Sequence, residues 1–135
     1  MKKRLIIGFA VLFVICSLFA IFFLCSGKRP YKSLCSADIA SATVSLYPPD
    51  KTIQITDIDE LVELLNDVVV YRKDNSYREY AGQAVVFNLD MYDGSQLEIT
   101  AYNPFVVING TGYITKYEPC EKLNSYANEL LYRSQ

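Results

Sequence analysis

The most pronounced pattern in the chain is an unbroken apolar segment near its start. Residues 5–24 (LIIGFAVLFVICSLFAIFFL) contain no charged side chain, and Ser17 is their only hydroxyl. Twenty helical residues span about 30 Å, which matches the hydrocarbon core of a bilayer. A helix also satisfies its backbone hydrogen bonds internally, as lipid requires. The sequence therefore predicts a transmembrane helix within residues 1–27, with residues 5–24 in contact with the lipid bilayer.

Two other interpretations of this segment stay open, a cleavable signal peptide and a lipoprotein signal. A cleavable signal peptide has a shorter apolar region of about 7–15 residues and a small-x-small cleavage site. The nearest candidate site, Cys25-Ser26-Gly27, fits that pattern poorly. A lipoprotein would need small residues before the lipidated cysteine, whereas Phe22, Phe23 and Leu24 precede Cys25. We adopt the uncleaved anchor as the interpretation.

Basic residues flank the apolar segment on both sides. Three precede it and three follow it: Lys2, Lys3 and Arg4, then Lys28, Arg29 and Lys32. Basic flanks favour the cytoplasmic side, so the two flanks compete, but the first span of a chain usually dominates the orientation. We therefore expect a single-pass protein of the cell membrane, with its N-terminus in the cytoplasm and its C-terminal domain outside.

Beyond a polar connector at residues 28–36, the pattern changes to the alternation typical of β-strands. Residues 39–47 (IASATVSLY) and residues 51–56 (KTIQIT) alternate apolar with polar side chains. Such alternation predicts two half-buried strands. Pro48-Pro49 separates them, because proline cannot donate to a strand ladder.

A helix is predicted next. Asp57 and Glu60 have the spacing of a capping box, in which the first side chain accepts a hydrogen bond from the backbone three residues on. One apolar stripe follows at spacings of three and four residues: Ile58, Leu61, Leu65 and Val68. Residues 68–71 (VVVY) then favour a strand, and the polar residues 72–82 favour a loop.

Two alternating segments meet at Asp93-Gly94, and their register decides the turn. A two-residue loop would pair the apolar Leu89 with Glu98 and mix the two faces. A three-residue loop over residues 92–94 instead pairs Leu89 with Leu97. It also places Gly94 at the left-handed position of a type I turn with a G1 bulge. We therefore predict the three-residue loop.

The remaining pattern completes an α+β fold. Asn109-Gly110 predicts a tight type I′ hairpin, and residues 120–133 predict a closing helix with one apolar face. The expected order is strand, strand, helix, a meander of four or five strands, then helix, with an antiparallel sheet covered by helices on one face. The chain divides into three parts: the anchor at residues 1–27, a linker at residues 28–36, and a small extracytoplasmic α+β domain at residues 37–135.

Charge divides the chain in the same way. Six of the 13 Lys and Arg lie in the first 32 residues, and all 15 Asp and Glu come later. Residues 1–32 therefore carry a formal charge of +6, and the rest of the chain carries −8. The acidic remainder argues against nucleic acid as a partner, because phosphate binding needs clustered cations. The chain has no His, which excludes mechanisms that need an imidazole base or ligand.

Cys35 and Cys120 lie near the two ends of the folded part. In an oxidising compartment, two such cysteines in a small domain suggest a structural bridge. Closing a loop of about 86 residues would stabilise the domain by roughly 4 kcal/mol in the chain-entropy treatment. We predict a Cys35–Cys120 disulfide, and we interpret Cys16 and Cys25 as apolar side chains of the span.

Candidate catalytic chemistry is sparse. The acidic residues at the start of the predicted helix are explained by capping and by the helix dipole. Asp90, Asp93 and Glu98 lack the spacing of a calcium loop, and the chain has no glycine-rich phosphate loop. We predict no catalytic residue, no metal site and no cofactor.

Tyrosine is the more informative residue type. All 11 Tyr follow the apolar segment, and binding surfaces favour Tyr because it buries much area while keeping a polar tip. The candidate contact surface is the loop with Tyr77, Arg78 and Tyr80. The alternative is that the tyrosines cover the second face of a thin sheet.

The order of these features resembles a known group of proteins. The helix start Ile-Thr-Asp-x-Asp-Glu-Leu (residues 55–61), the Asp93-Gly94 hairpin, the Ile-Asn-Gly turn followed by Tyr113, and the closing Leu-rich helix occur in sequence. Together they are similar to the small membrane-anchored extracytoplasmic domains of unknown function from Gram-positive bacteria. The resemblance implies a location and a fold, and it assigns no catalytic residue.

Three functions are compatible with these observations. The first is a membrane-anchored extracytoplasmic binding or accessory module. The second is an inhibitor or immunity-type protein, whose acidic domain would attract a cationic protein partner. The third is a carboxylate-dependent hydrolase, which would require a concave pocket with two convergent acids.

Overall fold

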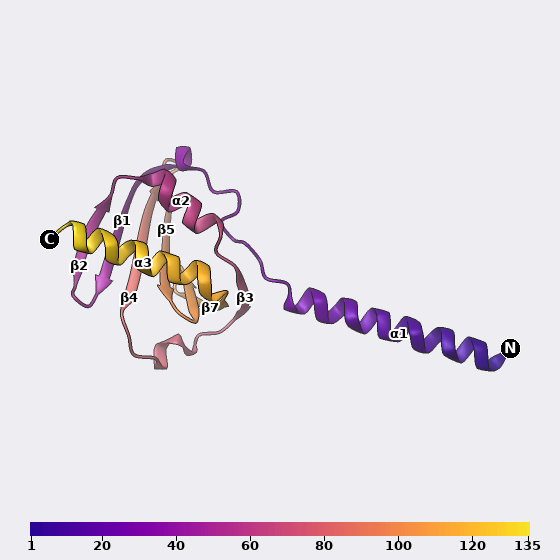
Figure 1. Cartoon of the computed structure of the whole chain (residues 1–135). Helices are drawn as coiled ribbons and strands as arrows, with labels where there is room; N and C mark the ends of the chain where they lie inside the picture. Colours follow the sequence, from indigo (N-terminus) through magenta and orange to yellow (C-terminus); the bar gives the residue numbers. More distant parts are fainter.

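The computed structural model describes residues 1–135, which form a long N-terminal helix followed by an α+β domain (Figure 1). The helices are α1 (Lys2–Cys25), α2 (Ile58–Asn66) and α3 (Tyr117–Arg133), with short 3₁₀ helices η1 (Ser36–Asp38) and η2 (Ser76–Glu79). The strands are β1 (Ile39–Tyr47), β2 (Lys51–Ile55), β3 (Val70–Lys73), β4 (Ala84–Met91), β5 (Gln96–Tyr102), β6 (Phe105–Ile108) and β7 (Thr111–Thr115).

The seven strands form a single antiparallel sheet in the order β2-β1-β4-β5-β6-β7-β3. The predicted α+β class with an antiparallel sheet is therefore confirmed. The sequence analysis did not anticipate the position of β3. This strand follows α2 in the chain, yet it crosses to the far edge of the sheet and pairs with β7.

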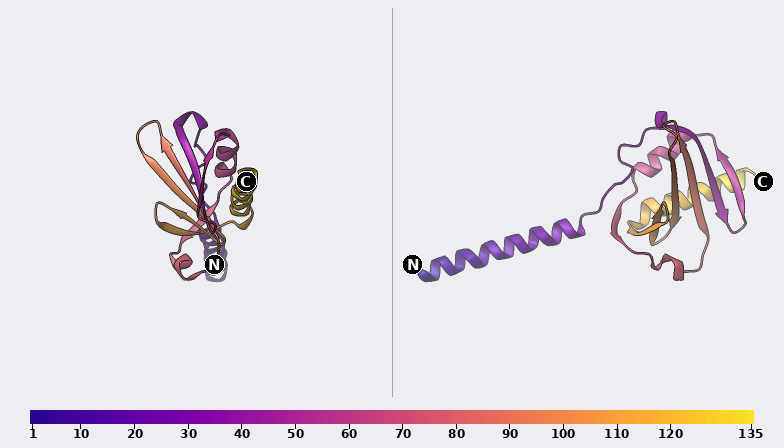
Figure 2. Two further views of the ribbon diagram at one scale, coloured as in Figure 1. Left: turned by 90° about the vertical axis from the view of Figure 1, so that its left-hand side faces the viewer. Right: turned by 180° about the vertical axis from the view of Figure 1, so that it is seen from behind.

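Helices α2 and α3 lie together on one face of the sheet (Figures 1 and 2). The core forms between them and the inward side chains of the central strands. Phe87 of β4 is completely buried and stacks on Tyr126 of α3, with ring centroids 6.5 Å apart. Leu61 of α2 and Leu123 of α3 are also completely buried.

Local signals in the sequence are found in the structure as expected. Asp57 Oδ1 accepts a hydrogen bond from the Glu60 backbone at 2.9 Å, so the predicted cap starts α2. Leu89 lies opposite Leu97 in the β4–β5 hairpin, and Gly94 has a φ of 86°. The three-residue loop is therefore confirmed. In the Asn109-Gly110 turn both residues likewise have a positive φ, 46° for Asn109 and 85° for Gly110.

The segment at residues 28–36 packs onto the domain and is not a free connector. The Lys28 N–H donates to the Val70 carbonyl at 2.7 Å, and the Val70 N–H donates back at 2.8 Å. Tyr31 is 6% exposed within the core, and the Asn66 side chain donates to its carbonyl at 2.6 Å. These contacts attach Lys28 to β3 and Tyr31 to the core beside α2.

Only Ser26 and Gly27 separate α1 from this docked segment. A Cβ atom at position 27 would collide with the Val69 side chain and would come within 3.0 Å of the Tyr71 ring. The chain therefore passes directly beside β3 as it leaves α1. Only glycine permits this close approach.

Helix α1 extends away from the domain, and none of its residues is buried (Figure 1). Its most apolar 18 residues have a mean hydropathy of 3.0, so by length and composition the helix is able to cross a membrane or to act as a signal sequence. No other part of the chain covers its apolar surface.

The predicted Cys35–Cys120 disulfide is absent, which corrects the sequence analysis. Both thiols are free: Cys35 is exposed before η1, and Cys120 is completely buried in the first turn of α3. The Cys120 thiol contacts the Phe105 carbonyl at 3.6 Å, whereas the Cys35 thiol contacts the Ser33 carbonyl at 3.7 Å. The two residues end the folded part in sequence, but they pack against different partners.

Alkaline pH is expected to destabilise the domain. Burial raises the pKa of the Cys120 thiol to about 12, and burial together with the charges of Glu60 and Asp57 raises the pKa of Tyr126 to about 12. The folded state therefore holds both protons more tightly than the unfolded chain. The stability that they contribute is complete below about pH 9 and is lost as the pH rises towards 12.

The measurement is the urea midpoint of the full chain in detergent between pH 8 and about pH 11. Tyr126→Phe keeps the ring and removes one titrating group, so its midpoint should fall less steeply. Equal slopes for the two proteins would contradict the assignment to Tyr126.

Candidate contact surface

The loop that contains Tyr77, Arg78 and Tyr80 lies on the face of the sheet opposite the helices. The loop packs on Phe105 of β6. Val106, the next residue, belongs to the core on the helix side, and successive side chains of a strand point to opposite faces, so Phe105 faces away from the helices. The Tyr80 ring contacts Phe105 edge-on, with centroids 5.2 Å apart, and the Tyr77 ring lies at 6.3 Å. These rings leave Phe105 only 1% exposed.

The loop is held to β7 by backbone contacts at Gly112. The Asp74 N–H donates to the Gly112 carbonyl at 2.9 Å, and the Gly112 N–H donates to the Asn75 side chain at 2.8 Å. A Cβ atom at position 112 would collide with the Asp74 carbonyl and would lie 2.6 Å from the Tyr77 ring. The Asp74 carboxylate in turn accepts the Ser76 N–H at 2.9 Å, and hydrogen bonding by the Ser76 side chain and backbone lowers the pKa of Asp74.

The three predicted residues are therefore brought together, but they differ in exposure. Tyr80 is 56% exposed and Arg78 is exposed, whereas Tyr77 is half-buried. The Arg78 guanidinium lies 5.6 Å from the centre of the Tyr77 ring, within the range of a cation–π contact. Tyr77 thus covers the sheet, as the alternative interpretation expected, while Arg78 and Tyr80 face the solvent. Their part in binding stays a prediction.

A polar hollow continues this surface across the same face of the sheet. Its volume is about 560 Å³, and its lining includes Thr43, Ser45, Thr52, Asn88, Glu98 and Asn109. The Ser45 and Thr52 hydroxyls hydrogen-bond to each other at 2.8 Å. Sequence reasoning missed this hollow. The hydroxyl residues that alternate along β1 are a signal for it, but alternation alone predicts only the polar face of a half-buried strand.

The loop and the hollow meet at the β6–β7 turn. Asn109 lines the hollow, and the Asn109 side chain accepts the Glu98 N–H at 2.9 Å. The next residue, Gly110, accepts a hydrogen bond from the Tyr77 hydroxyl at 3.4 Å. One continuous surface therefore combines an aromatic and cationic part with a part rich in hydroxyl and amide groups. We call it the outer-face surface.

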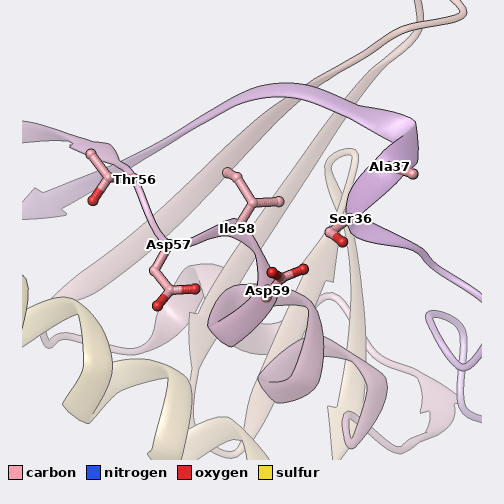
Figure 3. A pocket seen from close by; sticks show the side chains of 6 residues that line it. All are labelled: Ser36, Ala37, Thr56, Asp57, Ile58 and Asp59. Atoms are coloured by element: carbon pink, nitrogen blue, oxygen red, sulfur yellow. The ribbon is translucent and has the colours of Figure 1, made fainter.

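A second hollow lies at the start of α2. Figure 3 shows the Asp57 and Asp59 side chains there, with Ser36 and Ala37 of η1 nearby. Asp57 caps the helix, as its bond to the Glu60 backbone shows. The cap accounts for Asp57, and no group of three His, Cys, Asp or Glu side chains in the chain is arranged to hold a metal ion.

Acidic and basic residues are distributed unevenly over the domain. Four ion pairs occur, and their carboxylates are Asp67, Asp74, Glu118 and Glu129. The acids around the start of α2 and the β4–β5 turn make no ion pair. They leave a region of uncompensated negative charge, which we call the acidic region and define by Asp38, Asp57, Asp59, Glu60 and Asp93.

Comparisons with protein-family models, with curated proteins and with solved structures found no match. Functional proposals for this chain therefore rest on its own residues and geometry.

Proposed function

We propose that this chain is a single-span membrane protein whose extracytoplasmic domain binds a protein partner through the outer-face surface. Helix α1 supports the anchoring, because its apolar side chains are all exposed and only a lipid phase would cover them. The proposed orientation places the N-terminus in the cytoplasm, as the short basic tail favours. It agrees with the anchored Gram-positive domains that the sequence resembles.

The observation that carries the binding proposal is the preorganised Tyr77-Arg78-Tyr80 loop. Backbone bonds at Gly112 and ring contacts with Phe105 hold this loop in place before any partner arrives. Folding has therefore already ordered these side chains, so binding a partner costs less conformational entropy, which favours affinity. Tyr and Arg are also the residue types that most often dominate interface energies.

The test is recovery of crosslinked partners from membranes that contain the full chain. Arg78→Ala/Tyr80→Ala should lower the recovery of a specific partner about tenfold or more, since each such residue commonly contributes more than 1 kcal/mol. Arg133→Ala/Tyr132→Ala is a matched control, because it removes the same side-chain types from an exposed site at the C-terminal end of α3. Equal recovery with both variants would exclude this surface.

An inhibitor or immunity-type protein is the second candidate, and the acidic region favours it. Carboxylates without ion pairs would attract a cationic partner over a Debye length of about 8 Å at physiological ionic strength. The same recovery experiment separates the two proposals. A complex formed through the acidic region should survive loss of Arg78 and Tyr80 and should dissociate at high salt. Hydrolysis is not proposed: Asp57 caps α2, and the Asp90 carboxylate accepts hydrogen bonds from Ser41 and Gln96.

A further inference from the structure

Most basic residues of the domain gather beside β3 and the segment that leaves α1. Six exposed cations form this group, which we call the basic pole: Lys28, Arg29, Lys32, Arg72, Lys73 and Lys116. They come from three separate parts of the sequence. Tertiary structure therefore creates a cluster that the linear charge pattern does not show.

Backbone contacts place this cluster at the membrane end of the domain. Lys28 pairs with Val70 of β3, and the Lys116 N–H donates to the Val69 carbonyl at 2.9 Å. Three residues of extended chain reach at most about 10 Å, so the Lys28 backbone lies within about 10 Å of the end of α1. Figures 1 and 2 show β3 on the side of the domain nearer α1, and β2 and the C-terminus on the opposite side.

That distance brings the basic side chains to the lipid headgroups. The headgroup layer on each side of the hydrocarbon core is about 5–8 Å thick. A lysine or arginine side chain that extends from Lys28 or β3 towards α1 therefore reaches this layer. Tyr71, which lies beside Gly27 and is 42% exposed, adds the kind of aromatic side chain that membrane interfaces favour.

The charge of the basic pole is only partly compensated. Arg29 pairs with Asp67 at 3.3 Å, and Arg72 approaches Asp74 at 4.0 Å. The other four cations make no ion pair. With these two acids included, the basic pole carries a formal charge of +4, while the remainder of residues 28–135 carries −9. The basic pole and the remainder of the domain therefore carry opposite net charges.

We propose that the basic pole docks on anionic lipid headgroups and thereby holds the domain in one orientation on the membrane. This inference rests on the proposed membrane anchoring. Each cation near an anionic surface strengthens such attraction several-fold, and the effect decays within a Debye length. The same field repels the acidic remainder of the domain, which favours an orientation with the basic pole against the bilayer.

The test uses single tryptophan reporters, because the chain contains no Trp. Full-length Tyr71→Trp is reconstituted into phosphatidylcholine vesicles with or without phosphatidylglycerol, each containing a headgroup nitroxide as quencher. Quenching should be at least about twofold stronger with phosphatidylglycerol, and this difference should disappear at 1 M salt, where the Debye length is about 3 Å. Tyr132→Trp, at an 80% exposed site near the C-terminus, should respond to neither change.

Two charge variants in the Tyr71→Trp background complete the test. Lys73→Gln/Lys116→Gln should abolish most of the phosphatidylglycerol effect, whereas Lys51→Gln/Arg133→Gln changes the net charge equally and should retain it. Equal quenching in the two lipids, or equal behaviour of the two variants, would overturn the proposal. Resistance to an alkaline carbonate wash reports on anchoring separately, so a protein that stays with the vesicles but shows no lipid dependence refutes docking alone.

Discussion

Two aspartates in the middle of α1, Val14→Asp/Ile15→Asp, are expected to release most of the protein from membranes. Each acid at the centre of a span costs about 2.5–3.5 kcal/mol of insertion free energy. Each lost Val or Ile removes about 0.3–0.6 kcal/mol of favourable insertion free energy as well. The 15 Leu, Ile, Phe and Val residues of the span contribute about 5–9 kcal/mol on the same scale. Two acids therefore offset most of the driving force for insertion.

The measurement is the fraction of full-length protein that remains in the pellet after an alkaline carbonate wash. Val14→Leu/Ile15→Leu is the matched control, because it changes the same positions and keeps them apolar. The control should stay in the pellet. Retention of the aspartate variant at the control level would mean that something other than the apolar length of α1 holds the protein to the membrane.

Phe87→Ala is expected to destabilise the domain by about 3–5 kcal/mol, since it removes a large, completely buried aromatic side chain and leaves a cavity in the core. Phe87 is completely buried in β4, near the middle of the sheet, and it stacks on Tyr126. A small domain is stable by only about 5–15 kcal/mol in total. The substitution should therefore lower the melting temperature by about 20 °C.

Near-ultraviolet circular dichroism of the full chain in detergent measures this change, because every Tyr lies in the domain and none lies in α1. Tyr92→Ala serves as the control: its side chain is 73% exposed in the β4–β5 loop, so its effect should stay within about 0.5 kcal/mol. Similar melting temperatures for the two variants would show that the Phe87 site is not a close-packed part of the core.

The elements that were predicted well depend on nearby residues. The Asp57 cap, the register of Leu89 with Leu97 and the Asn109-Gly110 turn each follow from side-chain alternation or from backbone stereochemistry over a few positions. These preferences act before any distant contact forms. A single sequence is therefore enough to infer them.

The elements that were missed depend on partners far away in the sequence. The pairing of β3 with β7 and of Lys28 with Val70 joins segments about 40 residues apart, and a short apolar run does not specify which edge it will meet. Cys35 and Cys120 bracket the domain in sequence, but Cys120 is buried on the sheet-facing side of α3, whereas Cys35 is exposed before η1.

The candidate site divides in the same way. Composition identified Tyr77, Arg78 and Tyr80, because an aromatic and cationic loop is recognisable from residue type alone. The sequence did not show that these residues pack on Phe105 or that they adjoin the polar hollow. Both features depend on contacts of Gly112 and Asn109 that form only in the folded sheet.

By itself, then, the sequence determined an apolar helix long enough to cross a bilayer, the α+β class and the local turns, because hydrophobic periodicity and turn stereochemistry are properties of adjacent residues. Only the tertiary structure decided that the connector belongs to the domain, that six scattered cations meet beside α1, and that the outer face of the sheet forms one surface. These features arise when long-range strand pairing brings distant side chains together, and local preferences do not encode that pairing.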